Sequence, residues 1–170
     1  MSTLTLEALP LTAEAFRPYG DVIEGGDRFA VINRGTTRHH ADLAKIDVDA
    51  QGGRTRVSLY HVMPYDLPLE VAMLERHPLS SQLFMPLDDA PFLVVVAAKG
   101  ADAIAPSAVR AFLTNGRQGV NYHAGTWHHP VIALDRETDF LVVDRAGSGR
   151  NCDEFYFDEG ARITVRTSGR

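Results

Sequence analysis

Ten consecutive residues, 121–130, hold the densest group of chemically active side chains in the chain. They read Asn-Tyr-His-Ala-Gly-Thr-Trp-His-His-Pro and include three histidines, a tyrosine and the chain's one tryptophan. Histidine is the side chain best suited to proton transfer near neutral pH and is a common metal ligand. The segment therefore predicts proton-transfer or metal chemistry.

A second polar group lies upstream at Glu75 and His77. On an extended strand these side chains project to the same side, about 6.6–6.8 Å apart. This spacing suits two ligands of one metal, or a carboxylate that orients an imidazole. Arg76 would point the other way unless the strand bulges or ends there, and Pro78 favours an ending because proline cannot donate to a strand ladder. A surface salt bridge at a strand end is the alternative.

Strand alternation separates the histidines of the first group. In an extended segment 126–134, His128 faces one side, while Trp127 and His129 face the other. Adjacent histidines therefore cannot both line a pocket on a regular strand, and one is expected to be structural. His123 comes just before the turn expected at Ala124-Gly125, from which it could swing over a pocket.

The elements that must position these residues are mostly strands. Strand-type segments are 57–63, 69–77, 92–98, 126–134, 140–145 and 162–167. Helix signals are limited to a short turn at 12–16 and a segment at 107–115, which starts at Pro106-Ser107 and stops at Gly116. Short strands, glycine-rich turns and one or two short helices predict a mainly β sandwich or barrel.

Bulk properties narrow the class of protein. The 170 residues, 45% hydrophobic and 23% charged, fit one globular domain spanning 1–170. A formal charge of −5 argues against binding to nucleic acid or a membrane surface. The single cysteine, Cys152, and the absence of a signal-peptide pattern lead us to expect a cytoplasmic protein.

Several common motifs are missing. The chain has no G-x-S-x-G, P-loop, dinucleotide fingerprint, C-x-x-C or H-E-x-x-H, so no nucleotide cofactor is expected. Cys152 lacks a basic activator, and Asp144-Arg145 is interpreted as an ordinary ion pair. The loop that contains Arg34 and Arg38 is interpreted as a solvated rim.

The two polar groups resemble the motifs of cupins, small β-barrels with a lined pocket. The second cupin motif is P-x-G-x-x-H, and residues 123–128 keep its glycine and histidine with His123 in place of the proline. The first motif is H-x-H followed by glutamate. Here Glu75 and His77 occupy the H-x-H positions, and Gln82 lies near the place of the glutamate. The resemblance implies a jelly-roll, or double-stranded β-helix, barrel.

Longer segments resemble the bacterial ureidoglycolate lyase family over nearly the whole chain. They are residues 18–23, 74–79, 110–116, 119–123, 127–130, 139–141 and 144–145. The resemblance implies a homodimeric enzyme of allantoin breakdown that splits (S)-ureidoglycolate into glyoxylate and urea. It also implies a divalent metal, usually nickel. With Glu75 and Gln82 in the ligand positions, weak and exchangeable metal binding is expected.

The reaction then suggests roles for individual residues. The expected metal ligands are Glu75, His77, Gln82 and His128, and His77 or His128 could instead be the base. His123 is the candidate acid and Tyr122 an orienting hydroxyl. The expected substrate contacts are Gln82 and Asn121 to the ureido amide, Trp127, and Arg76 to the carboxylate.

Arginine is assigned the carboxylate because its planar fork pairs with one through two hydrogen bonds. Lysine is scarce, and neither Lys45 nor Lys99 lies in a candidate group. Arg34 or Arg38 competes with Arg76 for this role.

Two other functions remain open. A non-catalytic cupin that binds a sugar or small acid would need only a pocket, and its excess of histidines would be unexpected. A metal-dependent cupin isomerase or dioxygenase would need a complete ligand set.

Overall fold

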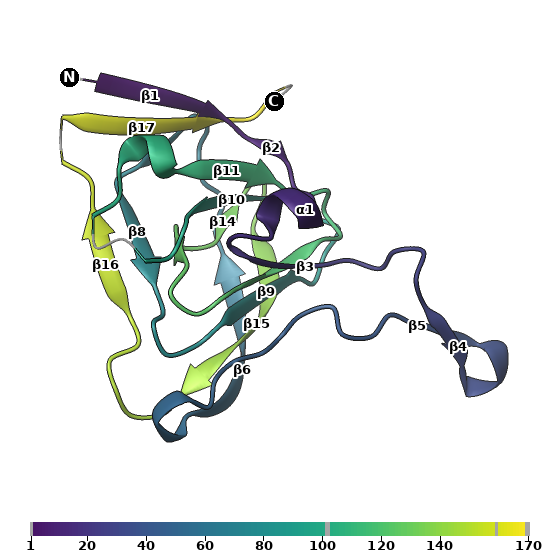
Figure 1. The fold of residues 1–170 in the computed structure, drawn as a ribbon. Coiled ribbons are helices and arrows are strands. Elements are labelled where there is room, and N and C mark those ends of the chain that lie inside the picture. The colour runs from purple at the N-terminus through teal and green to yellow at the C-terminus, as the bar shows by residue number, and fades with distance from the viewer. Residues whose placement is uncertain (1, 101–102, 159, 169–170) are drawn as a thin grey trace.

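The computed structural model describes residues 2–100, 103–158 and 160–168. Two sheets face each other as the walls of a barrel, a third sheet covers the outside of one wall, and a hairpin projects from the body (Figure 1). The mainly β, jelly-roll-like class predicted from the sequence is confirmed. In the described part of the chain, no helix has the length and apolar character needed to cross a membrane.

The first wall has the strand order β16-β8-β13-β10-β11-β2, with β14 also paired to β10. Its strands are β16 (Asp153–Tyr156), β8 (Met73–Arg76), β13 (Trp127–His128), β10 (Phe92–Ala97), β11 (Arg110–Leu113), β2 (Leu9–Pro10) and β14 (Ile132–Ala133). The second wall has the order β3-β12-β9-β15-β6. Its strands are β3 (Gly20–Ile23), β12 (Gly119–Tyr122), β9 (Gln82–Pro86), β15 (Thr138–Ala146) and β6 (Arg54–Val62).

The outer sheet has the order β1-β17-β7, formed by β1 (Ser2–Glu7), β17 (Ala161–Arg166) and β7 (Leu69–Val71). With this sheet the protein has two hydrophobic cores, one inside the barrel and one between the first wall and the outer sheet, so β10 is covered on both faces. Val94 and Val96 face the barrel interior with Phe84 and Phe140, whereas Val95 packs under the outer sheet. All six residues of β10 are buried. This double burial explains why the segment is continuously apolar rather than alternating.

The prediction of one strand over 69–77 with a single shared face is wrong. The chain changes sheets at Ala72: β7 pairs with β17 in the outer sheet, and β8 pairs with β13 and β16 in the first wall. The change of sheet also changes the alternation, and Leu74 is fully buried in the outer core. Glu75 consequently faces the barrel interior, but not as a continuation of the Leu69–Val71 face.

The prediction of a helix over 107–115 is also wrong. Pro106–Ala108 form one 3-10 turn (η3), and Arg110–Leu113 continue as β11 against β10. Pairing with a buried strand outweighs the weak local helix signal. The short helix near the N-terminus is confirmed as α1 (Ala13–Phe16), where the Thr12 hydroxyl accepts a hydrogen bond from the Ala15 N–H.

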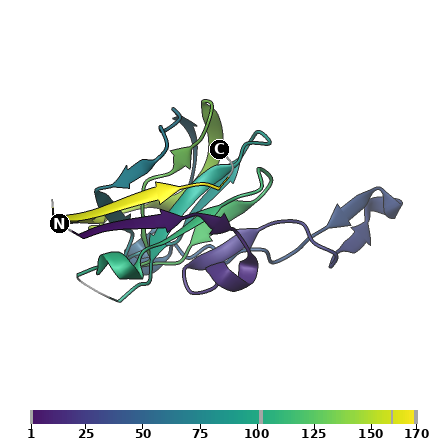
Figure 2. The same cartoon turned by 90° about the horizontal axis from the view of Figure 1, so that it is seen from above.

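Residues 24–46, here called the arm, leave the barrel and return to it (Figures 1 and 2). The arm contains a hairpin of β4 (Ala30–Ile32) and β5 (Thr37–His39), joined by a 3-10 turn at Asn33–Gly35 (η1). In the sheet order, β4 and β5 pair only with each other. A further 3-10 turn, η2 (Ala50–Gly52), precedes β6.

Candidate active site

Four side chains converge on one point inside the barrel. One carboxylate oxygen of Glu75 and one ring nitrogen each of His77 and His128 lie within 4.8 Å of one another. The Gln82 Oε1 lies 3.1 Å from the His77 Nε2 and 3.2 Å from the His128 Nε2. The Glu75 Oε1 lies 3.8 Å and 3.5 Å from the same two nitrogens. These four residues are the metal-ligand set expected from the sequence, and the structure brings all four together.

Strand pairing accounts for this convergence. Glu75 and His128 are directly opposite each other on β8 and β13, so their side chains share a face. His77 follows the end of β8, and Gln82 begins β9 in the facing wall. The turn predicted before His128 is present, with Gly125 at a φ of 80° that favours glycine.

Backbone carbonyls determine which nitrogen of each imidazole faces the cluster. The His77 Nδ1 is 2.6 Å from the Asn151 carbonyl oxygen, and the His128 Nδ1 is 3.0 Å from the Thr126 carbonyl oxygen. A carbonyl can only accept a hydrogen bond, so each Nδ1 is the donor. In a neutral imidazole, each Nε2 then presents its lone pair to the cluster.

The donor set therefore fits a divalent metal. Two imidazole nitrogens, the Glu75 carboxylate and the Gln82 amide oxygen turn lone pairs toward one another, an arrangement that a cation satisfies. Imidazole nitrogen with carboxylate and amide oxygen suits ions such as nickel and zinc. Without a cation, the Gln82 amide would have to turn its Nε2 inward to donate to both imidazoles.

Electrostatics keep the cluster in a ligand-like charge state. Burial tends to raise the pKa of Glu75, but a protonated His128, through its hydrogen bond and its charge, and the charges of the other nearby imidazoles outweigh burial, and the pKa is lowered. Burial lowers the pKa of His77, as does the neighbouring His128. An ionised Glu75 and a neutral His77 are the forms that bind metals.

Comparison with known proteins identifies the family. The family model described as ureidoglycolate lyase matches residues 3–164. The chain is 52% identical over 166 residues to a ureidoglycolate lyase of Pseudomonas aeruginosa strain LESB58, covering 97% of this chain and 96% of the relative. It is 53% identical over 167 residues to one of Stutzerimonas stutzeri, with the same coverage. The chain belongs to the ureidoglycolate lyase family.

Tyr122 lies beside the metal-ligand cluster and is not one of its members. Its ring stacks on the His128 imidazole, with centroids 4.2 Å apart and planes 9° apart. The ring is buried, and this burial strongly raises the pKa of the hydroxyl, which stays neutral. The contact fixes the plane of the imidazole from the opposite wall.

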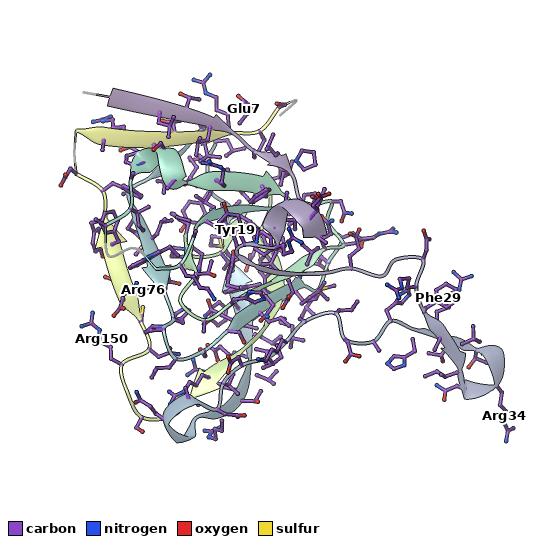
Figure 3. All side chains as sticks on the ribbon, viewed as in Figure 1. Glu7, Tyr19, Phe29, Arg34, Arg76 and Arg150 are labelled. Atoms are coloured by element: carbon purple, nitrogen blue, oxygen red, sulfur yellow. The ribbon has the colours of Figure 1, made fainter. Side chains whose placement is uncertain are left out.

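Arg76 and Trp127 do not face the cluster. The Arg76 guanidinium carbon lies 4.5 Å from the Trp127 ring centroid, and its Nε donates to Asp153 at 3.0 Å. Trp127 belongs to the core under the outer sheet. The expected redirection of Arg76 into the site is therefore wrong, because β8 continues through Arg76 with regular alternation. In Figure 3, Arg76 is on the barrel, and Arg34 is at the far tip of the arm.

Asn121 and His123 also lie away from the cluster. The Asn121 Nδ2 donates to the Asp21 carboxylate and the Lys45 carbonyl, both at 3.0 Å. The His123 Nε2 lies 3.1 Å from the Asp21 Oδ1. Asn121 alternates with Tyr122 on β12, so its side chain points out of the barrel. Asp21 therefore holds both residues on the outer side of the second wall.

His129 is separated from the cluster as strand alternation suggests. Its Nδ1 donates to the Pro130 carbonyl at 2.8 Å, and its ring meets Tyr65 edge-on. The side chain is nearly buried, and burial lowers its pKa.

The sequence did not single out Arg56 and Tyr60, which lie on the inner side of β6 near Asp144 of β15. Arg56 donates to Asp144 through Nε and Nη2, both at 2.8 Å, so Asp144 pairs with Arg56 rather than with Arg145. Tyr60 shares the inner face of β6, and its ring packs against Phe84. Burial raises the pKa of Tyr60, and the charges of Asp144 and Glu75 add to the effect. The even spacing of Arg56 and Tyr60 was the available sequence signal, because it places both side chains on the same face of a strand.

Proposed function

We propose that this protein cleaves (S)-ureidoglycolate to glyoxylate and urea in allantoin and purine catabolism. The observation that carries the proposal is the convergence of Glu75, His77, Gln82 and His128 inside the barrel of a chain belonging to the ureidoglycolate lyase family. The relatives' names supply the substrate, and the cluster supplies groups of the kind that the reaction needs.

The substrate carries a hydroxyl, a carboxylate and a ureido nitrogen on one carbon. Cleavage removes the hydroxyl proton, the oxygen becomes the aldehyde of glyoxylate, and the carbon–nitrogen bond breaks as the nitrogen gains a proton. The site needs a base, an acid and a group that holds the carboxylate. Acid–base assistance contributes about 10²–10⁴-fold.

In this proposal His77, His128, Gln82 and Glu75 hold a divalent metal, with nickel the ion suggested by the family resemblance. The metal would act as a Lewis acid toward substrate oxygen atoms. An amide in place of a carboxylate reduces the negative charge around the ion, which supports weak, exchangeable binding. The set lacks the full H-x-H and glutamate ligands on which the isomerase or dioxygenase alternative depends.

The protein's own groups then move the protons. Glu75 is ionised, and its side chain is 21% exposed, so one carboxylate oxygen can accept the hydroxyl proton while the other serves as the ligand. Tyr60 remains protonated and faces the interior from β6, so it can donate to the leaving nitrogen in place of His123. Tyr122 orients His128 through the ring stack rather than through its hydroxyl.

Arg56 takes the carboxylate role in this proposal. It lies on the inner face of β6, and its side chain is half exposed. Asp144 engages its Nε and Nη2, and in the described residues Nη1 makes no hydrogen bond. The ion pair holds the guanidinium plane in place with one edge available to an anion.

We also propose that two copies of the chain form a homodimer through the arm. A two-stranded hairpin alone is marginally stable in water. The arm also leaves apolar side chains exposed, with Val31 60% and Phe29 41% exposed. The edge strand β6 does the same, with Val57 64% and Leu59 59% exposed. Exposed apolar surface of this kind marks an interaction site. Val31→Asp and Leu59→Asp should each shift the mass measured by light scattering from dimer to monomer, whereas Leu87→Asp, at another exposed position, should not.

A cytoplasmic location is proposed as well, because the single cysteine suits a reducing compartment.

The activity test measures urea and glyoxylate released from racemic ureidoglycolate, with and without a chelator. We expect both products in equal amounts from half of the substrate, without ATP or a nicotinamide, and a lower rate after chelation. Ammonia in place of urea would indicate a hydrolase instead. Binding of ureidoglycolate without turnover would favour the non-catalytic cupin.

A further inference from the structure

Both lysines of the chain line one pocket. Lys45 and Lys99 are its only lysines and are far apart in the sequence. They meet at a cavity of about 280 Å³ whose lining is Lys45, Asp47, Ser81, Lys99, His123 and Ala124. The sequence predicted that neither lysine lies near a candidate residue. This prediction is wrong, because the fold brings Lys45 and Lys99 to the same pocket as His123.

Hydrogen bonds fix the segment that carries Lys45. The Lys45 N–H donates to the Asp21 Oδ2 at 3.1 Å, and its carbonyl accepts from the Asn121 Nδ2 at 3.0 Å. Two residues on, the Asp47 N–H donates to the Ser81 Oγ at 2.9 Å, and the Ser81 N–H donates to the Asp47 carbonyl at 2.8 Å. The backbone on both sides of the lysine is thus attached to the barrel.

Lys99 lies beside the 123–126 turn. It follows β10, and its Cβ lies 3.8 Å from the position that a Cβ on Gly125 would occupy. The Gly125 N–H donates to the His77 carbonyl at 2.9 Å, which joins the 123–126 turn to the loop after β8. The pocket therefore has a preformed backbone frame, and the two lysine side chains that line it are exposed.

The pocket is positively charged in an otherwise acidic protein. Within the described residues, neither lysine ammonium has a carboxylate within 4.0 Å, whereas Arg56, Arg117, Arg136, Arg150 and Arg162 each have one. The Asp47 carboxylate lines the same pocket without pairing to either ammonium. Asp21 is engaged by His123 and Asn121. Two ammonium groups against one carboxylate leave the lining with a net positive charge, which favours an anion beside them.

We propose that this pocket binds a small oxyanion between the two lysine ammoniums. It lies outside the barrel wall, because Ser81 and His123 adjoin Gln82 and Tyr122, whose side chains point inward. Compact ammonium charges suit a phosphate or a single carboxylate, whereas recognition by a planar fork requires arginine. The site is separate from the metal-ligand cluster and does not depend on the proposed reaction.

The scarcity of lysine permits a direct test. Reductive methylation with ¹³C-formaldehyde labels only Lys45, Lys99 and the N-terminal amine, and keeps their positive charge. The labelled protein is titrated with inorganic phosphate, and separately with glyoxylate, at constant ionic strength adjusted with chloride. We expect both lysine signals to shift with one shared dissociation constant while the N-terminal signal stays in place. The anion that saturates the lysine shifts at the lower concentration, phosphate or glyoxylate, is the preferred ligand of the two.

Lys45→Gln should weaken binding, measured on the remaining Lys99 signal, by roughly fivefold or more. The matched control is Arg117→Gln, which removes one charge at a highly exposed position away from the pocket and should leave the dissociation constant unchanged. Thermal unfolding confirms that both variants are folded. Equal shifts of all three amine signals, or equal weakening by the two variants, would overturn the proposal.

Discussion

Tyr122 and His128 stack face to face across the barrel, with ring centroids 4.2 Å apart and planes inclined by 9°. The tyrosine comes from β12 of one wall and the histidine from β13 of the other. Together with the Thr126 carbonyl, the stack determines where the His128 Nε2 points. Interactions that orient a metal ligand are typically worth about 10–100-fold in metal affinity or activity.

The first prediction separates the ring of Tyr122 from its hydroxyl. Tyr122→Phe keeps the stack and should retain kcat/KM within about threefold, because a neutral buried hydroxyl takes no part in the reaction. Tyr122→Leu removes the stack and should lower metal affinity and kcat/KM by about 10–100-fold. Isothermal titration with nickel and steady-state kinetics measure the two effects. A large defect in Tyr122→Phe would return the orienting role to the hydroxyl.

The second prediction compares adjacent histidines. His128→Ala removes a ligand and should lower kcat by at least about 100-fold, and because His128 is fully buried it should also lower the free energy of unfolding by about 1–3 kcal/mol. His129→Ala leaves the cluster intact and removes a nearly buried side chain, so it should lower the free energy of unfolding by about 1–3 kcal/mol. Urea denaturation and kinetics on both variants provide the comparison. Similar catalytic losses would mean that His129 also reaches the reacting groups.

The third prediction concerns the amide of Gln82. Gln82→Glu adds a negative charge to the ligand set, and a carboxylate cannot turn a donor toward the imidazoles. Nickel affinity should therefore rise by at least about tenfold, and the metal should survive dialysis against a chelator. Gln82→Leu, of similar size without a ligand atom, should lose affinity instead. Metal content after dialysis distinguishes the cases, and unchanged retention in Gln82→Glu would exclude residue 82 as a ligand.

The metal-ligand cluster could be predicted from the sequence, whereas its surroundings could not. The two-residue spacing of Glu75 and His77 is a local property of an extended strand, and it held although β8 is only four residues long. The change of sheet at Ala72 is decided by pairing of β7 with β17, whose partner residues are 92 to 96 positions away in the chain. A local pattern contains no information about that partner.

Arg76 and Arg56 illustrate the same limit on the prediction of side-chain partners. Arg76 adjoins two ligands in sequence, but strand alternation places it against Trp127. Arg56 is remote from every motif. Its spacing from Tyr60 places both on one face of β6, but only the pairing with Asp144 on β15 shows that this face is the inner one. His123 likewise adjoins Tyr122 but points to Asp21 outside the barrel. Proximity in sequence was a poor guide wherever adjacent side chains diverge.

The fourth prediction tests Arg56 against Arg76 as the carboxylate site. Arg56→Lys keeps a positive charge beside Asp144 but loses the fork, so kcat/KM should fall by about tenfold or more. Arg76→Lys should leave kcat/KM nearly unchanged and lower stability, because it weakens contacts with Trp127 and Asp153. Arg56→Ala is less informative, since it leaves the buried Asp144 unpaired. A kinetic defect confined to Arg76→Lys would restore the original assignment.

The fifth prediction concerns Asp21, which attaches the Lys45 segment to the barrel. Burial tends to raise the pKa of Asp21, but hydrogen bonds from Asn121, His123 and the Lys45 N–H outweigh it and hold the pKa below its usual value. A carboxylate with a lowered folded-state pKa contributes stability above its unfolded-state pKa, about 3.9. This contribution is lost as the pH falls through the folded-state value.

Asp21→Asn should therefore lower the free energy of unfolding at pH 7 by on the order of 1 kcal/mol. The difference from the unmodified protein should shrink below about pH 4 and vanish toward pH 2, because both proteins then lack the charge. Asp89→Asn is the matched control, since Asp89 is 75% exposed and should show no difference at either pH. Urea denaturation across this range measures the effect. A difference between Asp21→Asn and the unmodified protein that is independent of pH would show that Asp21 acts through shape rather than charge.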